Sequence, residues 1–334
     1  MNDITRILEM TDHPAFCAED GVICAVNPAA AKRQFEIGAQ VSELLTAGAD
    51  EYREFQTGYL WLELRCCGED YDACVRELGG RHIFTLEQAD ADAELRLLAL
   101  AAQAIREPLG NVMALLEELD APTDTAARIE RGLYQLLRIV GNMSPPPAAR
   151  PELQDVGALL REVWDKVQPA CESRGVKLRY TEPPMAVLSN VDGELLTRAV
   201  HNLLSNSLKF AEPGDTLRLE LKRLKKSYRI LLRDRGGHRW PISDPFTRYR
   251  REPGLGDGRE GLGLGLKLVQ IAASAHGGTV LLYPDGEELI AELSLPIRQD
   301  TTLRSPRLRI SYAGERDPML VELSDVLSPE FYQK

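Results

Sequence analysis

The sequence lacks the features that mark several classes of protein. No apolar run approaches the ~18–20 residues that a membrane-spanning helix needs, so no membrane span is predicted. The start, MNDITRILEMTDHPAF, has no basic region followed by an apolar stretch, so we predict no signal peptide. The net charge of −11 is a poor match for general nucleic-acid binding. We therefore expect a cytoplasmic protein without a nucleic-acid partner, and 334 residues are enough for two or three domains.

The sequence also has no Cys-x-x-Cys pair, which argues against a zinc site. In a reducing cytosol a disulfide framework is not expected either. We interpret the cysteines as small buried hydrophobic residues, with redox or ligand sensing as the alternative. Five of the six lie in the first quarter of the chain: Cys17, Cys24, Cys66, Cys67 and Cys74.

Residues 1–88 have the pattern of a small α/β unit. The apolar runs predict strands over 21–27, 59–67 and 80–88, a helix over 28–36 that has Pro28 in its first turn, and a turn at 68–72. The stretch HPAFCAEDGVICAVNPAAAKRQFEIGAQVSELL, residues 13–45, resembles a PAS domain. That resemblance implies a sensor domain that binds a small ligand or cofactor, transmits a signal or dimerises.

Residues 89–143 predict an antiparallel helical hairpin. Two helices with one apolar stripe each cannot bury those stripes alone, so we predict a homodimer that completes a four-helix bundle. The first stripe comprises Leu95, Leu98, Ala102, Ile105, Leu109, Val112, Leu116 and Leu119, and the second comprises Ala126, Ile129, Leu133, Leu136, Val140 and Met143.

A proline-rich linker, SPPPAARP at 144–151, precedes a larger unit over 152–297. Its strands are mostly separated from its helices along the chain, which predicts an α/β sandwich rather than a doubly wound sheet. The C-terminal extension, 298–334, predicts a strand over 307–314 and a short docking helix, with a solvated tail as the alternative. The apolar face of that helix would carry Met319, Leu320, Leu323 and Val326.

The run HNLLSNSLKF, residues 201–210, carries the most informative polar residues. Asn202 and Asn206 are four positions apart, so a helix places both amides on one face, with Lys209 one turn further on. A carboxamide oxygen suits Mg²⁺ and an ammonium suits phosphate. Taken alone, the pattern favours a polar stripe that faces solvent, because most polar positions on helices are solvated.

Two further motifs follow in order. DRGG, residues 234–237, places an acid and two glycines at the end of a strand, and GLGLGL, residues 261–266, precedes an apolar helix. Glycines there let backbone N–H groups approach an anion, and the helix N-terminus adds positive potential.

This order of motifs resembles the ATP-binding domain of sensor histidine kinases, in the superfamily that includes gyrase, Hsp90 and MutL. The resemblance implies ATP and Mg²⁺ as cofactors, with Asn206 on the Mg²⁺, Lys209 near phosphate and Asp234 accepting from the adenine amino group. DPFTRYRR, residues 244–251, resembles the F box, and His238 stands where the family prefers glycine. The nucleotide-binding residues implied are Asn202, Asn206, Lys209, Phe210, Asp234, Gly236, Phe246, Gly261, Gly263, Leu264 and Gly265.

The same resemblance explains a proline inside the first helix. AQAIREPL, residues 102–109, aligns with the family's Ser-His-Glu-Leu-Arg-Thr-Pro-Leu box, so Pro108 is a kink that the family shares. Gln103 stands where the phosphate-accepting histidine belongs, and Ala104 where the adjacent acid belongs. An amide nitrogen is not a usable nucleophile at neutral pH, and none of the five histidines lies between 91 and 143.

The sequence thus predicts a multidomain α+β protein that resembles a sensor histidine kinase without its phosphate acceptor. We expect an ATP-binding pseudokinase that regulates a partner, with a response regulator or another kinase as candidates. One alternative is an active kinase that phosphorylates a residue on another protein. The other is an interaction module with a vestigial nucleotide pocket.

Overall fold

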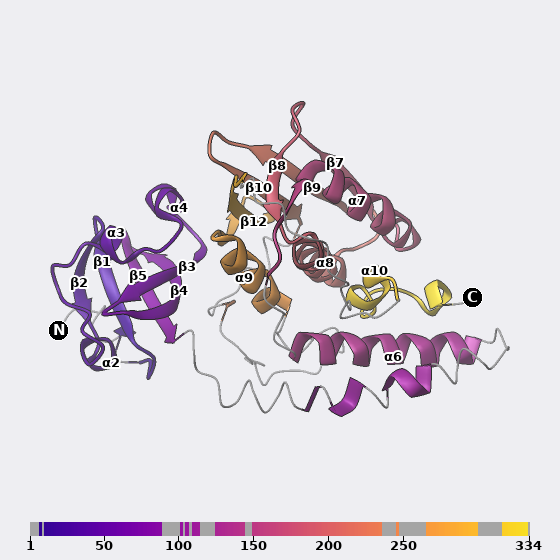
Figure 1. Cartoon of the computed structure of the whole chain (residues 1–334), viewed down its shortest axis with the longest axis horizontal. Coiled ribbons are helices and arrows are strands. Elements are labelled where there is room, and N and C mark those ends of the chain that lie inside the picture. The colour runs from indigo at the N-terminus through magenta and orange to yellow at the C-terminus, as the bar shows by residue number, and fades with distance from the viewer. Residues whose placement is uncertain are drawn as a thin grey trace.

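A computed structural model gives the fold of the chain (Figure 1). The structure describes residues 7–8, 10–88, 101–102, 104–106, 109–113, 124–143, 149–235, 245–246, 265–299 and 316–332. The predicted strand over 307–314 and Pro108 lie outside these residues.

The N-terminal residues form five antiparallel strands and three short helices. The strands are β1 (Ala15–Glu19), β2 (Val22–Val26), β3 (Tyr59–Cys66), β4 (Glu69–Leu78) and β5 (Arg81–Gln88), and the helices are α2 (Pro28–Ala31), α3 (Val41–Leu44) and α4 (Ala49–Glu54). They enclose a core of their own, in which the ring of Phe16 stacks on that of Phe84 at 4.4 Å between centroids.

Two local predictions in this unit were wrong. The predicted turn at 68–72 is mostly strand, because β4 begins at Glu69 and pairs with β3 along the whole length of β3. The helix predicted over 28–36 ends after Ala31. Its start is capped by Asn27, whose buried side chain also accepts from the N–H of Ala15 and donates to the carbonyl of His13, so it serves the loop as well as the helix.

The C-terminal half of the sheet has alternating apolar residues, which give each strand one buried face. In β9, for example, Leu217, Leu219 and Leu221 are buried. Its members are β7 (Lys177–Thr181), β9 (Thr216–Arg223), β10 (Ser227–Asp234), β11 (Thr279–Asp285) and β12 (Glu288–Pro296), packed by α7 (Val156–Ser173), α8 (Gly193–Phe210) and α9 (Gly265–His276), while β6 (Glu152–Asp155) pairs with β8 (Leu188–Val191) in a small second sheet.

The two sets of strands join into one ten-stranded sheet, in the order β2-β1-β5-β4-β3-β11-β12-β10-β9-β7. At the junction Leu60 of β3 lies opposite Leu281 of β11. Gly58, at φ +97°, allows the close approach, because a Cβ there would lie 2.3 Å from the carbonyl oxygen of Leu282. An ion pair of 2.7 Å between Asp72 of β4 and Lys267 of α9 spans the same junction.

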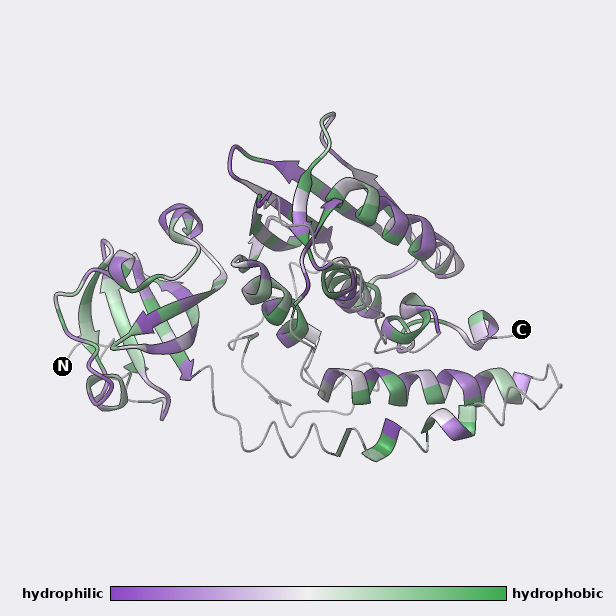
Figure 2. Cartoon of the chain, in the orientation of Figure 1, coloured by the Kyte–Doolittle hydropathy of each residue, from purple (hydrophilic) through white to green (hydrophobic). Residues whose placement is uncertain are grey.

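The long helix α6 (Asp124–Met143) runs beneath this half of the molecule (Figure 1). Residues 101–102, 104–106 and 109–113 are helical as well. Of the predicted stripe on α6, Val140 is buried but Ile129 and Leu136 are 46% and 47% exposed. A second face of α6, with Tyr134 and Leu137, is buried instead, and both hydrophobic and polar residues run along the helix in Figure 2.

The last described residues cover that second face. A short helix, α10 (Pro318–Glu322), is capped by Asp317, whose carboxylate accepts from the N–H of Met319 at 2.9 Å. The 3-10 helix η2 (Pro329–Tyr332) places the ring of Tyr332 4.9 Å from that of Tyr134. The structure thus has a short packed helix where one is predicted, but only Met319 of the predicted apolar face is a buried residue of α10 and Leu320 is only partly buried. Leu323 and Val326 are buried too, although they follow the end of the helix.

The cysteines agree only partly with the expectation of burial. Cys17, Cys66 and Cys74 are buried, whereas Cys24 and Cys67 are exposed. Cys24 follows the alternation of β2 to the solvent face, and Cys67 lies in the turn before β4 at φ +52°. Burial raises the pKa of the Cys17 thiol to about 12 and that of Cys66 to about 11, which disfavours their thiolates.

Candidate functional site

Helix α8 carries three of the polar residues that the sequence singles out. Asp192 caps its first turn by accepting from the N–H of Leu195 at 3.1 Å. Asn202 is completely buried, Asn206 is partly exposed, and the side chain of Lys209 is 10% exposed. These side chains do not form a solvated stripe, because the helix is packed along most of its circumference.

The N-terminus of α9 lies beside the two asparagines. A Cβ on Gly265 would be 3.1 Å from Oδ1 of Asn202 and 3.6 Å from Nδ2 of Asn206. At its other end α9 is tied to the start of α8, because His276 Nε2 accepts from the N–H of Asp192 at 2.9 Å. The two helices therefore hold the amides against a helix N-terminus, where an anion is favoured.

The structure also locates Asp234 and Phe246. Asp234 ends β10 and its carboxylate accepts a hydrogen bond from the hydroxyl of Ser207 on α8. Phe246 is buried in the main core, the hydrophobic cluster that includes the buried residues of α7, α8 and α9. Phe210, at the end of α8, is 43% exposed. The structure thus places Asp234 next to α8.

The remaining predicted positions divide between described and undescribed residues. Ala104 is helical and exposed. The others lie outside the described residues: Gln103, Gly236, Gly261, Gly263 and Leu264, and His238 with them.

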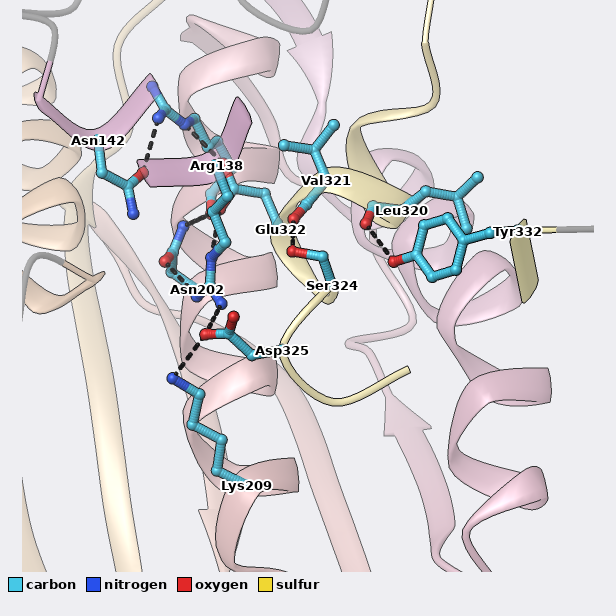
Figure 3. Close-up of polar contacts among 11 residues, drawn as sticks. Arg138, Asn142, Asn202, Lys209, Leu320, Val321, Glu322, Ser324, Asp325 and Tyr332 are labelled. Atoms are coloured by element: carbon cyan, nitrogen blue, oxygen red, sulfur yellow. Dashed lines mark hydrogen bonds and ion pairs between the residues drawn. The ribbon is translucent and has the colours of Figure 1, made fainter. Parts of the chain in front are cut away.

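The C-terminal segment, which we define as residues 317–332, enters this site (Figure 3). Glu322 has no exposed surface, and its Oε1 lies 2.7 Å from Nε of Arg198. Its Oε2 accepts from Nδ2 of Asn202 at 2.9 Å and lies 3.4 Å from Nε of Arg138. Arg198 in turn donates to Oδ1 of Asn142 at 2.8 Å. A carboxylate this deeply buried is stable only because it is paired and hydrogen-bonded.

A second carboxylate of the segment contacts the lysine. Oδ2 of Asp325 lies 2.6 Å from Nη1 of Arg138 and 2.9 Å from Nζ of Lys209. Burial would raise the pKa of the Asp325 carboxyl, but Arg138 and Lys209 outweigh it and hold this pKa below its usual range. Asp325 is therefore a carboxylate, and its charge is directed at Lys209.

Main-chain contacts hold the same segment. The guanidinium of Arg131 on α6 donates to the carbonyl oxygens of Ser324 and Asp325, both at 3.1 Å. Arg174, at the end of α7, donates to the carbonyl of Val326 at 2.8 Å. The segment is thus bound by its backbone as well as by its side chains.

Sequence reasoning missed the charged partners of this site. Arg138, Arg198, Glu322 and Asp325 were not predicted as functional, although the apolar stripe of the segment was. A usable signal existed: Glu322 and Asp325 stand among apolar residues that the stripe predicts to be buried. Buried acids at such positions require cationic partners.

Comparison with known proteins shows which families this chain resembles. Residues 191–301 match the family of histidine kinase-, DNA gyrase B- and HSP90-like ATPases. The sensor histidine kinase CusS of Escherichia coli is 31% identical over 138 residues, which are 40% of this chain and 28% of CusS. The comparisons support the resemblance of this chain to sensor histidine kinases. The sensor protein CutS of Streptomyces coelicolor is 26% identical to this chain over 75% of the chain and 62% of CutS.

Solved structures of histidine kinases resemble this chain as well. The complex of ThkA with the response regulator TrrA covers 87% of the chain and 97% of that chain, with a TM-score of 0.43 and 12% identity. Full-length ShkA with AMPPNP covers 62% of the chain and 47% of that chain, with a TM-score of 0.48 and 20% identity.

These comparisons support a histidine-kinase-like ATPase domain over residues 191–301, and such a domain implies ATP binding. The chain spans less than two thirds of the length of the curated relatives CusS and CutS. Among the described helices, none has the length and apolarity to cross a membrane.

Proposed function

We propose that this sensor histidine kinase relative binds ATP with Mg²⁺ and regulates a partner without phosphorylating itself. One observation carries the proposal: α8 places Asn202 and Asn206 beside the N-terminus of α9, where Gly265 lies close to both amides, and it carries Lys209 one turn further on. A cation, two amides and a helix N-terminus form an arrangement that suits an anionic nucleotide.

The residues present fit the nucleotide and its metal. The partly exposed amide of Asn206 offers a hard oxygen ligand for Mg²⁺, and Lys209 offers a charge for phosphate. Asp234, at the end of β10 next to α8, would accept from the adenine amino group. The glycine run at 261–266 would supply main-chain N–H groups. When bound, Mg²⁺ neutralises part of the phosphate charge.

The proposed absence of self-phosphorylation rests on Gln103 and Ala104. Gln103 offers a delocalised amide nitrogen where the family has a histidine, and Ala104 offers no acid to polarise one. Residues 1–88 would act as a PAS-like sensor, supported by a core of their own. Residues 89–143 would dimerise, and a response regulator or another kinase would be the partner.

Calorimetry on the full chain tests the nucleotide site. Wild type should bind ATP in the presence of Mg²⁺, and Asn206→Ala should weaken that binding about ten-fold or more, because the metal loses an oxygen ligand. Asn111→Ala, which changes an exposed asparagine of another helix, serves as the control and should bind like wild type. Equal affinities for wild type and Asn206→Ala would reject the assigned metal ligand.

Incubation with γ-labelled ATP, with and without cell extract, separates the proposal from its alternatives. No acid-labile label should appear on this chain. Label on a partner would favour the active kinase, and no ATP binding at millimolar concentration would favour the vestigial pocket.

A further inference from the structure

Three cationic side chains from two helices converge on one place. Arg138 comes from α6, and Arg198 and Lys209 come from α8. The carboxylates of Glu322 and Asp325, both in the C-terminal segment, lie between them (Figure 3). The sequence separations are long, since Arg198 and Glu322 are 124 positions apart.

This place has the properties of a built binding site. The side chains of Arg138 and Arg198 are each 6% exposed and that of Glu322 is not exposed at all, so an occupant of this place must bring negative charge. Buried apolar residues of the occupant, among them Val321 and Leu323, join the main core beside the ion pairs. Charge and apolar burial together select an acidic, amphipathic peptide.

The carboxylates contact the same residues that the proposed nucleotide site needs. Asp325 contacts Lys209 at 2.9 Å, and Glu322 accepts from the amide of Asn202 at 2.9 Å. Lys209 cannot keep this ion pair and also compensate a phosphate at full strength, because each contact requires the ammonium to face it.

We propose that α6 and α8 form a binding site for an acidic peptide, that the C-terminal segment of this chain occupies it, and that the segment competes with the nucleotide polyphosphate for Lys209. This inference rests on the proposed nucleotide site. It adds a further consequence, because Glu322 links Arg138 of α6 to Arg198 of α8. Release of the segment removes this carboxylate bridge and leaves the direct hydrogen bonds from Arg198 to Asn142 and from Arg138 to Asn202.

Nucleotide affinity of full-length variants tests the competition. Asp325→Asn preserves the shape of the side chain but frees Lys209, and it should bind ATP with Mg²⁺ about ten-fold more tightly than wild type. Glu330→Gln removes one charge from an exposed residue of the same segment and should bind like wild type. Circular dichroism and a melting curve verify that each variant is folded.

A second variant tests whether displacement of the segment, and not only the loss of the charge at Asp325, tightens nucleotide binding. Arg131→Ala removes donors to main-chain oxygens of the segment and leaves Lys209, Glu322 and Asp325 unchanged. It should also tighten nucleotide binding. Hydrogen exchange across 317–332 should be faster in Arg131→Ala than in wild type, and faster in wild type when ATP and Mg²⁺ are added.

Each result decides between the two proposals. Equal nucleotide affinity in wild type, Asp325→Asn and Arg131→Ala would overturn the competition and leave the proposed function standing. Slower exchange across 317–332 with ATP would overturn it as well, because the segment would then be part of the nucleotide-bound state. Absence of nucleotide binding in wild type and in both variants would reject the proposed function itself, and the competition with it.

Discussion

His201 is a buried residue whose ionisation the fold opposes. It lies on α8 with its ring buried, and neither ring nitrogen has a hydrogen-bond partner among the residues that the structure describes. Burial is the main cause that lowers the pKa of His201 to about 4, and the charge of Lys166 lowers this pKa further. The negative charges of Glu322, Asp317 and Glu162 raise the pKa but do not outweigh burial. The ring is therefore neutral in the folded chain at neutral pH.

The free energy of unfolding should therefore fall when the pH drops from about 6.5 towards about 4. In this window His201 is protonated in the unfolded chain but not in the folded chain. The free energy of unfolding therefore falls by up to about 1.4 kcal/mol for each pH unit. Urea unfolding of wild type and His201→Leu at pH 7.0, 6.0 and 5.0 checks this. The stability of wild type relative to His201→Leu should decrease at each step, and a constant difference would contradict the assigned pKa.

At the scale of elements, the junction of β3 and β11 depends on a glycine. A Cβ on Gly58 would collide with the carbonyl of Leu282, whereas one on Gly38, at a similar φ of +95°, would have no atom within 4 Å. Both positions are strained for alanine, by about 1–3 kcal/mol. The pair of variants therefore separates backbone strain from steric contact at the junction.

Gly58→Ala should cost about 2 kcal/mol more in unfolding free energy than Gly38→Ala, because the added methyl group has to push β11 away from the chain before β3. Thermal or urea unfolding measures the difference. Equal costs would mean that the N-terminal strands do not pack against β11 as the ten-stranded sheet requires.

At the scale of the whole molecule, α6 has two apolar faces, one buried and one exposed. One is buried under the C-terminal segment and α8, and the other leaves Ile129 and Leu136 exposed, as Ile105 and Val112 are on the helix that precedes α6. Exposed apolar residues of both helices are the ones that the predicted four-helix bundle would bury in a homodimer.

Ile129→Glu with Leu136→Glu should convert a dimer into a monomer, because charges in the seam would lose their hydration. Light scattering at micromolar concentration measures the mass. Thr125→Glu, an exposed position of the same helix, should stay dimeric. If wild type is itself a monomer under these conditions, the predicted bundle is wrong.

The sequence by itself determined those features that depend on residues close together along the chain. Helical spacing of four placed Asn202 and Asn206 on one side of α8, and the apolar spacing of Met319, Leu323 and Val326 predicted a docking helix. Strand alternation identified β9 and β10 but missed β4, whose acidic start reads as a turn.

Only the tertiary structure decided which charges meet. Arg138 and Asp325 are 187 positions apart and Arg198 and Glu322 are 124 apart, and no periodicity connects them. Their pairing follows from α6, α8 and the C-terminal segment packing together, which buries acids that only nearby cations can stabilise. The tertiary structure also determines that β3 and β11 join the two sets of strands into one sheet. An edge strand can pair with any other edge strand that the rest of the fold brings beside it.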